Sequence, residues 1–272
     1  MNHAEWDDYH GVIRSRKGGW LIGRGVNSHG LDLMNEVVGH CSYMQVVMLN
    51  ATGRLPSPQL GQWMDAIHIC LSWPDPRIWC NRIGALAGAA RTSPVAATCA
   101  GVMAADSRSY GIRPLQEGVE FIQRAFAEID TRGIDVTEFV EQEVRKHGGK
   151  PYLMGYARPI AKGDERIGAM QRVAHQLGFE DGPHLRLAYA IESCLSNRFD
   201  ETMNINGYMS GFLSDQGYSP EEVHRIFSAL VFSGVTACYV DTVDRPEGAF
   251  APLKVEDIEY SGADSRALPP RE

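Results

Sequence analysis

The sequence lacks several features that would assign it to a specialised class of protein. It has no cluster of Lys and Arg, and its formal net charge is -8, which argues against non-specific nucleic-acid binding. No apolar run approaches the roughly 18 residues of a membrane span, and Met1–Trp20 contains no apolar segment typical of a secretory signal. There is also no internal repeat and no low-complexity segment. We therefore expect no membrane and no nucleic acid among its partners.

Closely spaced cysteines are missing as well. The six cysteines are scattered and form no Cys-x-x-Cys pair, which favours reduced, mostly buried thiols in a cytoplasmic protein. The segment His68-Ile69-Cys70 has metal-binding residue types, but its apolar helical surroundings favour a position in the core. We expect no metal site.

What the 272 residues do contain is a recurring helical pattern. Hydrophobic residues make up 44% of the sequence, which is enough for a substantial core. The segments Ser57-Pro58 and Ser219-Pro220-Glu221-Glu222 are typical helix starts, and the second has the residues of a capping box. One face of the helix after Ser57 is formed by Leu60, Trp63, Met64, Ile67 and Leu71. These patterns predict an almost all-α protein.

Two regions need a more specific interpretation. Near the N-terminus, Gly18–Gly23 predicts a short strand or hairpin, and the apolar spacing over Leu31–Val38 predicts a helix. Small residues dominate two later predicted helices, about Arg77–Ala90 and Ser93–Ala105. Their Gly and Ala residues favour close contact between helix backbones. That contact fits a buried helix hairpin and a dimer interface equally well.

The segment from Gly155 to Arg166 is the strongest candidate for a ligand-binding loop. Its glycines let the backbone approach a ligand closely. Lys162 and Arg166 are donors suited to a carboxylate or phosphate, and Asp164 is the expected N-cap of the helix that follows. The same residues also fit an ordinary surface loop ahead of an ordinary helix.

This loop resembles one in the citrate synthase and citryl-CoA lyase family, where Gly-Phe/Tyr-Gly-His-Pro-x-x-Lys runs into Asp-Pro-Arg. The residues that match this pattern are Gly155, Tyr156, Pro159, Lys162, Asp164 and Arg166. Further segments similar to family motifs follow the family's order: residues 49–56, Arg82, residues 204–207, residues 234–241 and residues 260–266. The resemblance implies a large helical domain, residues 1–111 and 221–272, and a smaller inserted helical domain, residues 112–220. It also implies a homodimer and an active site between the two domains.

The resemblance further implies carbon–carbon chemistry on an acyl-CoA. In the family, an aspartate removes a proton from the acetyl group, and two histidines stabilise the enol and polarise the ketone. Here Asn206 stands at the aspartate position and Arg158 at the ketone-binding histidine, and Ser109 or Tyr110 replaces the other histidine. An amide is no useful base near neutral pH, and arginine effectively never deprotonates. The sequence is therefore a divergent example that lacks the usual acid–base groups.

Two hypotheses follow, and a helical domain with a chance resemblance is a third. The first is an enzyme that forms or cleaves a carbon–carbon bond between an acyl-CoA and a 2-oxo or hydroxy polycarboxylic acid. Its candidate catalytic residues are Arg158, Asn206, Tyr110 and Ser109, and its candidate substrate-binding residues are Arg166, Arg82 and Lys162. It needs no cofactor, because the coenzyme A thioester is a substrate. The second is a catalytically inactive binding or partner subunit, either a homodimer or a hetero-oligomer with an active relative.

Overall fold

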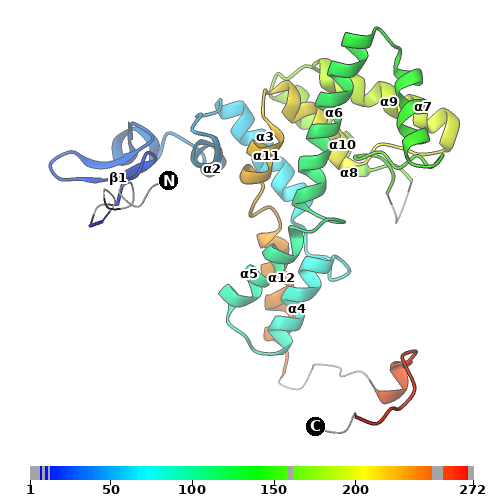
Figure 1. Ribbon diagram of the computed structural model, residues 1–272. Helices are drawn as coiled ribbons and strands as arrows, with labels where there is room; N and C mark the ends of the chain where they lie inside the picture. The colour runs from blue at the N-terminus through cyan, green and yellow to red at the C-terminus, as the bar shows by residue number, and fades with distance from the viewer. Residues whose placement is uncertain (1–6, 8–9, 12, 159–161, 247–253, 269–272) are drawn as a thin grey trace.

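The computed structural model describes residues 7, 10–11, 13–158, 162–246 and 254–268, and most of them are helical (Figure 1). The strands are β1 (Gly18–Leu21), β2 (Gly25–Ser28) and β3 (Leu31–Asp32), and a π-helical turn, η1 (Leu33–Val37), follows them. The helices are α2 (Tyr43–Thr52), α3 (Pro58–Leu71), α4 (Trp79–Ala89), α5 (Pro94–Ala105), α6 (Ile112–Arg132), α7 (Val136–Lys146), α8 (Glu165–Gln176), α9 (Pro183–Phe199), α10 (Ile205–Asp215), α11 (Pro220–Ile226), α12 (Phe232–Val243) and the short 3-10 helix η2 (Val255–Asp257). This confirms the predicted helical architecture. In the described part of the chain, no helix has both the length and the apolar character needed to cross a membrane.

The helix starts predicted from Ser-Pro pairs are confirmed. The Ser57 hydroxyl accepts a hydrogen bond from the backbone N–H of Leu60 at 3.2 Å, and α3 begins at Pro58. At α11, Ser219 and Glu222 make both hydrogen bonds of the capping box, each accepting from the other's backbone N–H. Such bonds satisfy N–H groups that have no partner inside the helix, so they fix where each helix begins.

The N-terminal region forms a three-stranded antiparallel sheet in the order β1-β2-β3, with Gly18 opposite Ser28. The strand predicted at Gly18–Gly23 is confirmed, but the helix predicted over Leu31–Val38 is wrong. There the chain makes β3 and then only η1, which Val38 ends in an extended conformation. The Asp32 carboxylate fixes the start of this turn by accepting from the N–H groups of Met34 and Asn35, so residues 31 and 32 stay outside the helical turn.

Helix α10 lies at the centre of the largest group of packed helices. Its residues from Gly207 to Ser214 are all buried, and α6, α8 and α9 pack around it (Figure 1). The Trp63 ring of α3 stacks on the Phe212 ring of α10 with 4.1 Å between centroids. Because α10 is enclosed by neighbours, its first turn has a fixed position, and this turn carries one side of the candidate site.

The small-residue helices α4 and α5 pack with α12 in a separate bundle at the other end of the molecule (Figure 1). A Cβ added at Gly84 would lie 2.5 Å from the carbonyl oxygen of Val235, and one added at Gly101 would lie 2.5 Å from Val235 Cγ1. No side chain fits at these distances, so glycine is required. The predicted close helix packing is confirmed within one chain. The outer face of α5 leaves Val95 and Met103 exposed.

Candidate functional site

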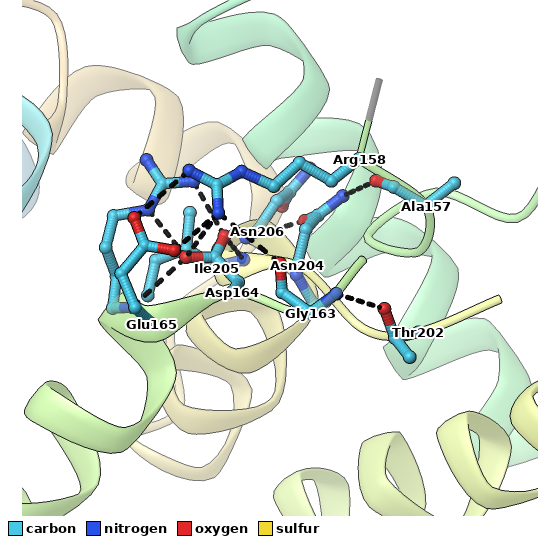
Figure 2. Close-up of polar contacts among 11 residues, drawn as sticks. Ala157, Arg158, Gly163, Asp164, Glu165, Thr202, Asn204, Ile205 and Asn206 are labelled. Atoms are coloured by element: carbon cyan, nitrogen blue, oxygen red, sulfur yellow. Dashed lines mark hydrogen bonds and ion pairs between the residues drawn. The ribbon is translucent and has the colours of Figure 1, made fainter. Parts of the chain in front are cut away.

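The loop that begins at Gly155 pairs with the chain that enters α10, so two distant segments of sequence form one unit. Tyr156 and Met203 form an antiparallel bridge. The N–H of Ala157 donates to the Thr202 carbonyl at 2.8 Å, and the Asn204 N–H donates to the Gly155 carbonyl at 3.0 Å. These bonds hold the loop against the first turn of α10, and Figure 2 shows Ala157 beside the Asn204 side chain at this turn.

Asn204 joins the two segments through its side chain. Its Nδ2 donates to the Ala157 carbonyl at 2.7 Å, and its Oδ1 accepts from the Asn206 N–H at 2.9 Å as the N-cap of α10. Ala157 is held at a φ of 71°, a left-handed conformation that costs a residue with a side chain roughly 1–2 kcal/mol. Gly155 is also left-handed, and a Cβ there would lie 2.7 Å from Gly207 Cα. The loop is therefore tightly constrained just before Arg158.

Asp164 connects the starts of α8 and α10, and we call this contact the Asp164 junction. Its side chain is 0% exposed, and it caps α8 as predicted, accepting from the N–H of Arg166 at 3.2 Å. Its Oδ2 also accepts from the N–H of Ile205 at 2.9 Å. Nε and Nη2 of Arg166 grip the carboxylate at 2.8 and 2.7 Å. Burial alone raises the pKa of Asp164, but the hydrogen bonds and charge of Arg166 outweigh it and hold the pKa below its ordinary value. Asp164 is thus a buried anion with a structural role.

Arg158 has a different kind of partner. Its side chain is only 12% exposed, yet it pairs with Glu165, whose side chain is 73% exposed (Figure 2). Nη1 donates to Glu165 Oε2 at 2.6 Å, and Nη2 donates to Oε1 at 3.2 Å. Nη1 also lies 3.9 Å from Asp164 Oδ1. The hydrogen bond from Arg158 lowers the pKa of Glu165. Arg158 is therefore a nearly buried cation with an exposed counter-ion.

The amide of Asn206 lies in the contact between α10 and α6. Its Nδ2 donates to the Pro114 carbonyl at 2.7 Å, and its Oδ1 accepts from the Ser210 hydroxyl at 3.0 Å. A Cβ at Gly118 would lie 2.5 Å from that Oδ1, so glycine makes room for the amide. Both polar atoms of Asn206 have partners within the protein, which ties this residue to helix packing.

Tyr110 and Ser109 lie in the turn between α5 and α6. The Tyr110 ring lies 5.5 Å from the Trp79 ring, and burial raises the pKa of its hydroxyl, helped by a contact with the Cys80 thiol. The positive charge of Arg166 acts in the opposite direction, so Tyr110 lies within electrostatic reach of the Asp164 junction. Ser109 is exposed, and Ser107 instead makes the hydrogen bonds of the turn.

The two remaining sequence-predicted residues lie on exposed surface. Lys162 pairs with Asp200 beyond the end of α9, and both side chains are largely exposed. Arg82 is exposed on α4. The structure thus brings Arg158 and Arg166 together at Asp164 and pairs Lys162 with Asp200 at the end of α9. Pro159, matched in the sequence, lies outside the described residues.

Sequence reasoning gave no role to Glu165, the direct partner of Arg158. The available signal was an acidic residue next to Asp164, between two arginines of the same loop. In the described ranges, no group of three His, Cys, Asp or Glu side chains is arranged to hold a metal ion.

A pocket of about 180 Å³ borders Leu153 and Met154, which lead into the loop. Two of its charged lining residues are already paired, because the Glu143 carboxylate accepts from Arg124 at 2.9 Å, and Glu143 also accepts from Lys146 at 2.6 Å. Small-molecule sites usually measure about 300–1,000 Å³. The pocket is below that range, so we do not assign the ligand to it.

Comparison with known proteins places this geometry in a known fold. No family model and no curated protein matches the sequence. The structure is similar to citryl-CoA lyase from Hydrogenobacter thermophilus, with a TM-score of 0.78 and 20% identity over 95% of this chain and 98% of that one. Citrate synthase from Thermotoga maritima MSB8 gives a TM-score of 0.61 and 20% identity over 84% of this chain and 60% of that one.

A third similar structure is ATP citrate lyase from Methanothrix soehngenii, determined in complex with citrate and coenzyme A. Its TM-score is 0.67 at 14% identity, and the match covers 96% of this chain and 46% of that one. The chain therefore spans nearly all of the citryl-CoA lyase and about half of the larger enzyme. These similarities confirm the fold that the sequence motifs predicted: the chain has the citrate synthase-like fold of citryl-CoA lyase and citrate synthase.

Proposed function

We propose that this chain binds a 2-oxo or hydroxy polycarboxylic acid together with an acyl-CoA, and forms or cleaves a carbon–carbon bond between them. The observation that carries this proposal is the pair of guanidinium groups, Arg158 and Arg166, which lie 3.9 and 2.7 Å from the same Asp164 carboxylate. The guanidinium fork of Arg158 matches a planar carboxylate, and the positive charge of Arg166 beside it favours an acid with more than one carboxylate. The fold shared with citryl-CoA lyase supports the acyl-CoA part of the proposal.

In this proposal the ligands lie between a large helical domain, residues 1–111 and 221–272, and a small one, residues 112–220. The polycarboxylic acid contacts Arg158 first, because Arg158 has the exposed counter-ion. Tyr110 is the candidate donor to an enolate-like oxygen, since a partly buried neutral hydroxyl is a competent oxyanion donor. The acyl-CoA is a substrate and no further cofactor takes part.

We also propose that two copies of the chain associate through the outer face of α5. Val95 and Met103 of this face are 71% and 77% exposed. Apolar surface of this kind marks interaction sites when it is contiguous. Size-exclusion chromatography with light scattering tests the homodimer, and Met103→Glu is expected to shift it toward the monomer.

A second candidate function is a non-catalytic binding or partner subunit. It is favoured by Asn206, because its Nδ2 and Oδ1 both have hydrogen-bond partners in the contact between α10 and α6. It is also favoured by Asp164 and Glu165, the carboxylates that contact Arg158, because both have lowered pKa values and are weak bases near neutral pH.

One pair of measurements separates the two functions. The protein is incubated with a panel of acyl-CoAs and 2-oxo acids, and with a citryl-type thioester, and products are identified by mass spectrometry. Calorimetric titration with oxaloacetate, citrate and coenzyme A measures binding. Turnover that is lost in Arg158→Gln supports the enzyme. Binding without turnover supports the binding subunit, and absence of both contradicts the proposal.

A further inference from the structure

The two arginines of the loop are held by carboxylates that differ greatly in their surroundings. Asp164, which holds Arg166, has a 0% exposed side chain and accepts backbone hydrogen bonds from two helix starts. Glu165, which holds Arg158, is 73% exposed and accepts hydrogen bonds from Arg158 through both of its carboxylate oxygens. The pairs are adjacent in the chain, yet only the second can open toward solvent.

Opening the Asp164 pair would leave a buried carboxylate without its main counter-charge, which is strongly destabilising. Opening the Glu165 pair returns a carboxylate to water at the first position of α8, where the helix dipole still favours a negative charge. Arg158 itself cannot follow Glu165 outward easily, because 12% exposure leaves its side chain packed and Nη1 also donates to the Gly163 carbonyl at 3.3 Å. When the pair opens, a two-pronged donor remains in place, with Asp164 Oδ1 still 3.9 Å from Nη1 and therefore beyond hydrogen-bonding distance.

We propose that Glu165 occupies the position of a ligand carboxylate on Arg158, and that the ligand binds by replacing it there. This inference rests on the proposed function and adds a determinant of ligand choice. Glu165 meets Arg158 through both of its oxygens, at 2.6 and 3.2 Å, which is the arrangement a free carboxylate would adopt. The exchange moves one exposed side chain and breaks no covalent bond.

A tethered carboxylate is a strong competitor. Groups joined by a short linker have effective concentrations in the millimolar range, so a free monocarboxylate at lower concentration does not displace Glu165. An acid with a second carboxylate is also attracted by the positive charge of Arg166, which shares Asp164 with Arg158. Glu165 therefore makes the site selective for polycarboxylates over monocarboxylates such as pyruvate.

The test is calorimetric titration of Glu165→Gln and Glu165→Ala with oxaloacetate, citrate and pyruvate. Removing the competing carboxylate is expected to tighten the binding of oxaloacetate and citrate by about 3- to 10-fold. Exposed ion pairs are worth up to about 1 kcal/mol, and a forked pair is worth somewhat more. Pyruvate binding is expected to become measurable in the same variants, so the ratio of the affinity for polycarboxylates to that for monocarboxylates falls.

Glu141→Gln is the matched control, because Glu141 pairs with Arg198 between α7 and α9, away from the loop. It is expected to bind as wild type does. The double variant Arg158→Gln/Glu165→Ala is expected to show no gain over Arg158→Gln, since the gain requires the guanidinium. Circular dichroism confirms that each variant is folded.

The outcomes separate this inference from the proposed function. If wild type binds oxaloacetate or citrate and both Glu165 variants bind equally or more weakly, the inference is overturned while the proposed function stands. Tighter binding that persists without Arg158 also overturns it. If neither wild type nor any folded variant binds these acids, both proposals are overturned.

Discussion

The Asp164 junction and the bundle of α4, α5 and α12 both bring backbones into close contact, but by opposite means. In the bundle, Gly84 and Gly101 remove side-chain atoms so that Val235 can fill the space. At the junction, a buried carboxylate receives hydrogen bonds from the starts of two helices and from Arg166. The first contact depends on shape alone, and the second depends on charge. Different substitutions, and different changes of pH, should therefore destabilise the two regions.

The largest expected effect is at the junction. Asp164→Ala removes the carboxylate that the Arg166 guanidinium grips and leaves that charge without its partner. We expect this to lower the free energy of unfolding by about 3–5 kcal/mol. Chemical denaturation measures the free energy of unfolding. The control is Asp241→Ala, which removes an exposed aspartate–arginine pair with Arg245 and is expected to cost less than about 1 kcal/mol. Equal losses in the two variants would show that the junction does not depend on a buried charge.

In the bundle, adding one methyl group is expected to cost about 1–3 kcal/mol, because the core has no space for it. At Gly101 the two nearest atoms to the added Cβ are Cγ1 and Cγ2 of Val235, at 2.5 and 2.7 Å, whereas at Gly84 the nearest is the Val235 carbonyl oxygen at 2.5 Å, with Cγ1 at 2.9 Å. Val235→Ala should therefore recover more of the loss in Gly101→Ala than in Gly84→Ala. A double-mutant cycle of unfolding free energies measures the difference, and equal coupling at both glycines contradicts the described packing.

The pH dependence of stability separates the two regions further. The pKa of Asp164 is lower in the folded protein than its ordinary value of 3.8. Its contribution to stability is therefore fully present above about pH 4 and is lost as the pH falls through the folded pKa. The stability difference between wild type and Asp164→Asn should be constant from pH 5 to 8 and shrink below pH 4. The difference between wild type and Gly84→Ala should show no such change, and a parallel fall in both would count against this assignment.

The smallest expected effect is a gain in the stability of the folded protein. Ala157 has a φ of 71°, which glycine adopts without the steric cost of a Cβ. Ala157→Gly removes the steric cost but makes the unfolded chain more flexible, which favours unfolding. The net effect is expected to be a stabilisation of about 0.5–1 kcal/mol. Thermal unfolding measures it, with Ala190→Gly in the regular helix α9 as a destabilising control. A loss at position 157 would mean that the loop is not strained there.

Much of the fold follows from local sequence signals. Ser57, Ser219 and Asp164 act within three residues of themselves, so their helix starts could be predicted. The helix predicted at Leu31–Val38 was wrong because the chain becomes helical only after the cap at Asp32 and is extended again at Val38, which apolar spacing does not reveal. Glu165 was missed because its partner Arg158 is seven positions away, on the other side of a loop.

Asn206 shows the limit more clearly. Its position after Asn204 could be read from the sequence, but its partner Pro114 is 92 residues away in α6. Only the packing of α6 against α10 brings the two together, and Gly118 makes that packing possible. A residue type can suggest chemistry, but the tertiary contacts of the fold decide whether its polar atoms are available.

Helix α10 is enclosed by α6, α8 and α9, and its residues from Gly207 to Ser214 are all buried. The helix therefore cannot shift without disturbing its neighbours, whereas the Glu165 side chain is 73% exposed. Under the proposed function, substitutions at position 165 could change which acids bind while the interior keeps its packing.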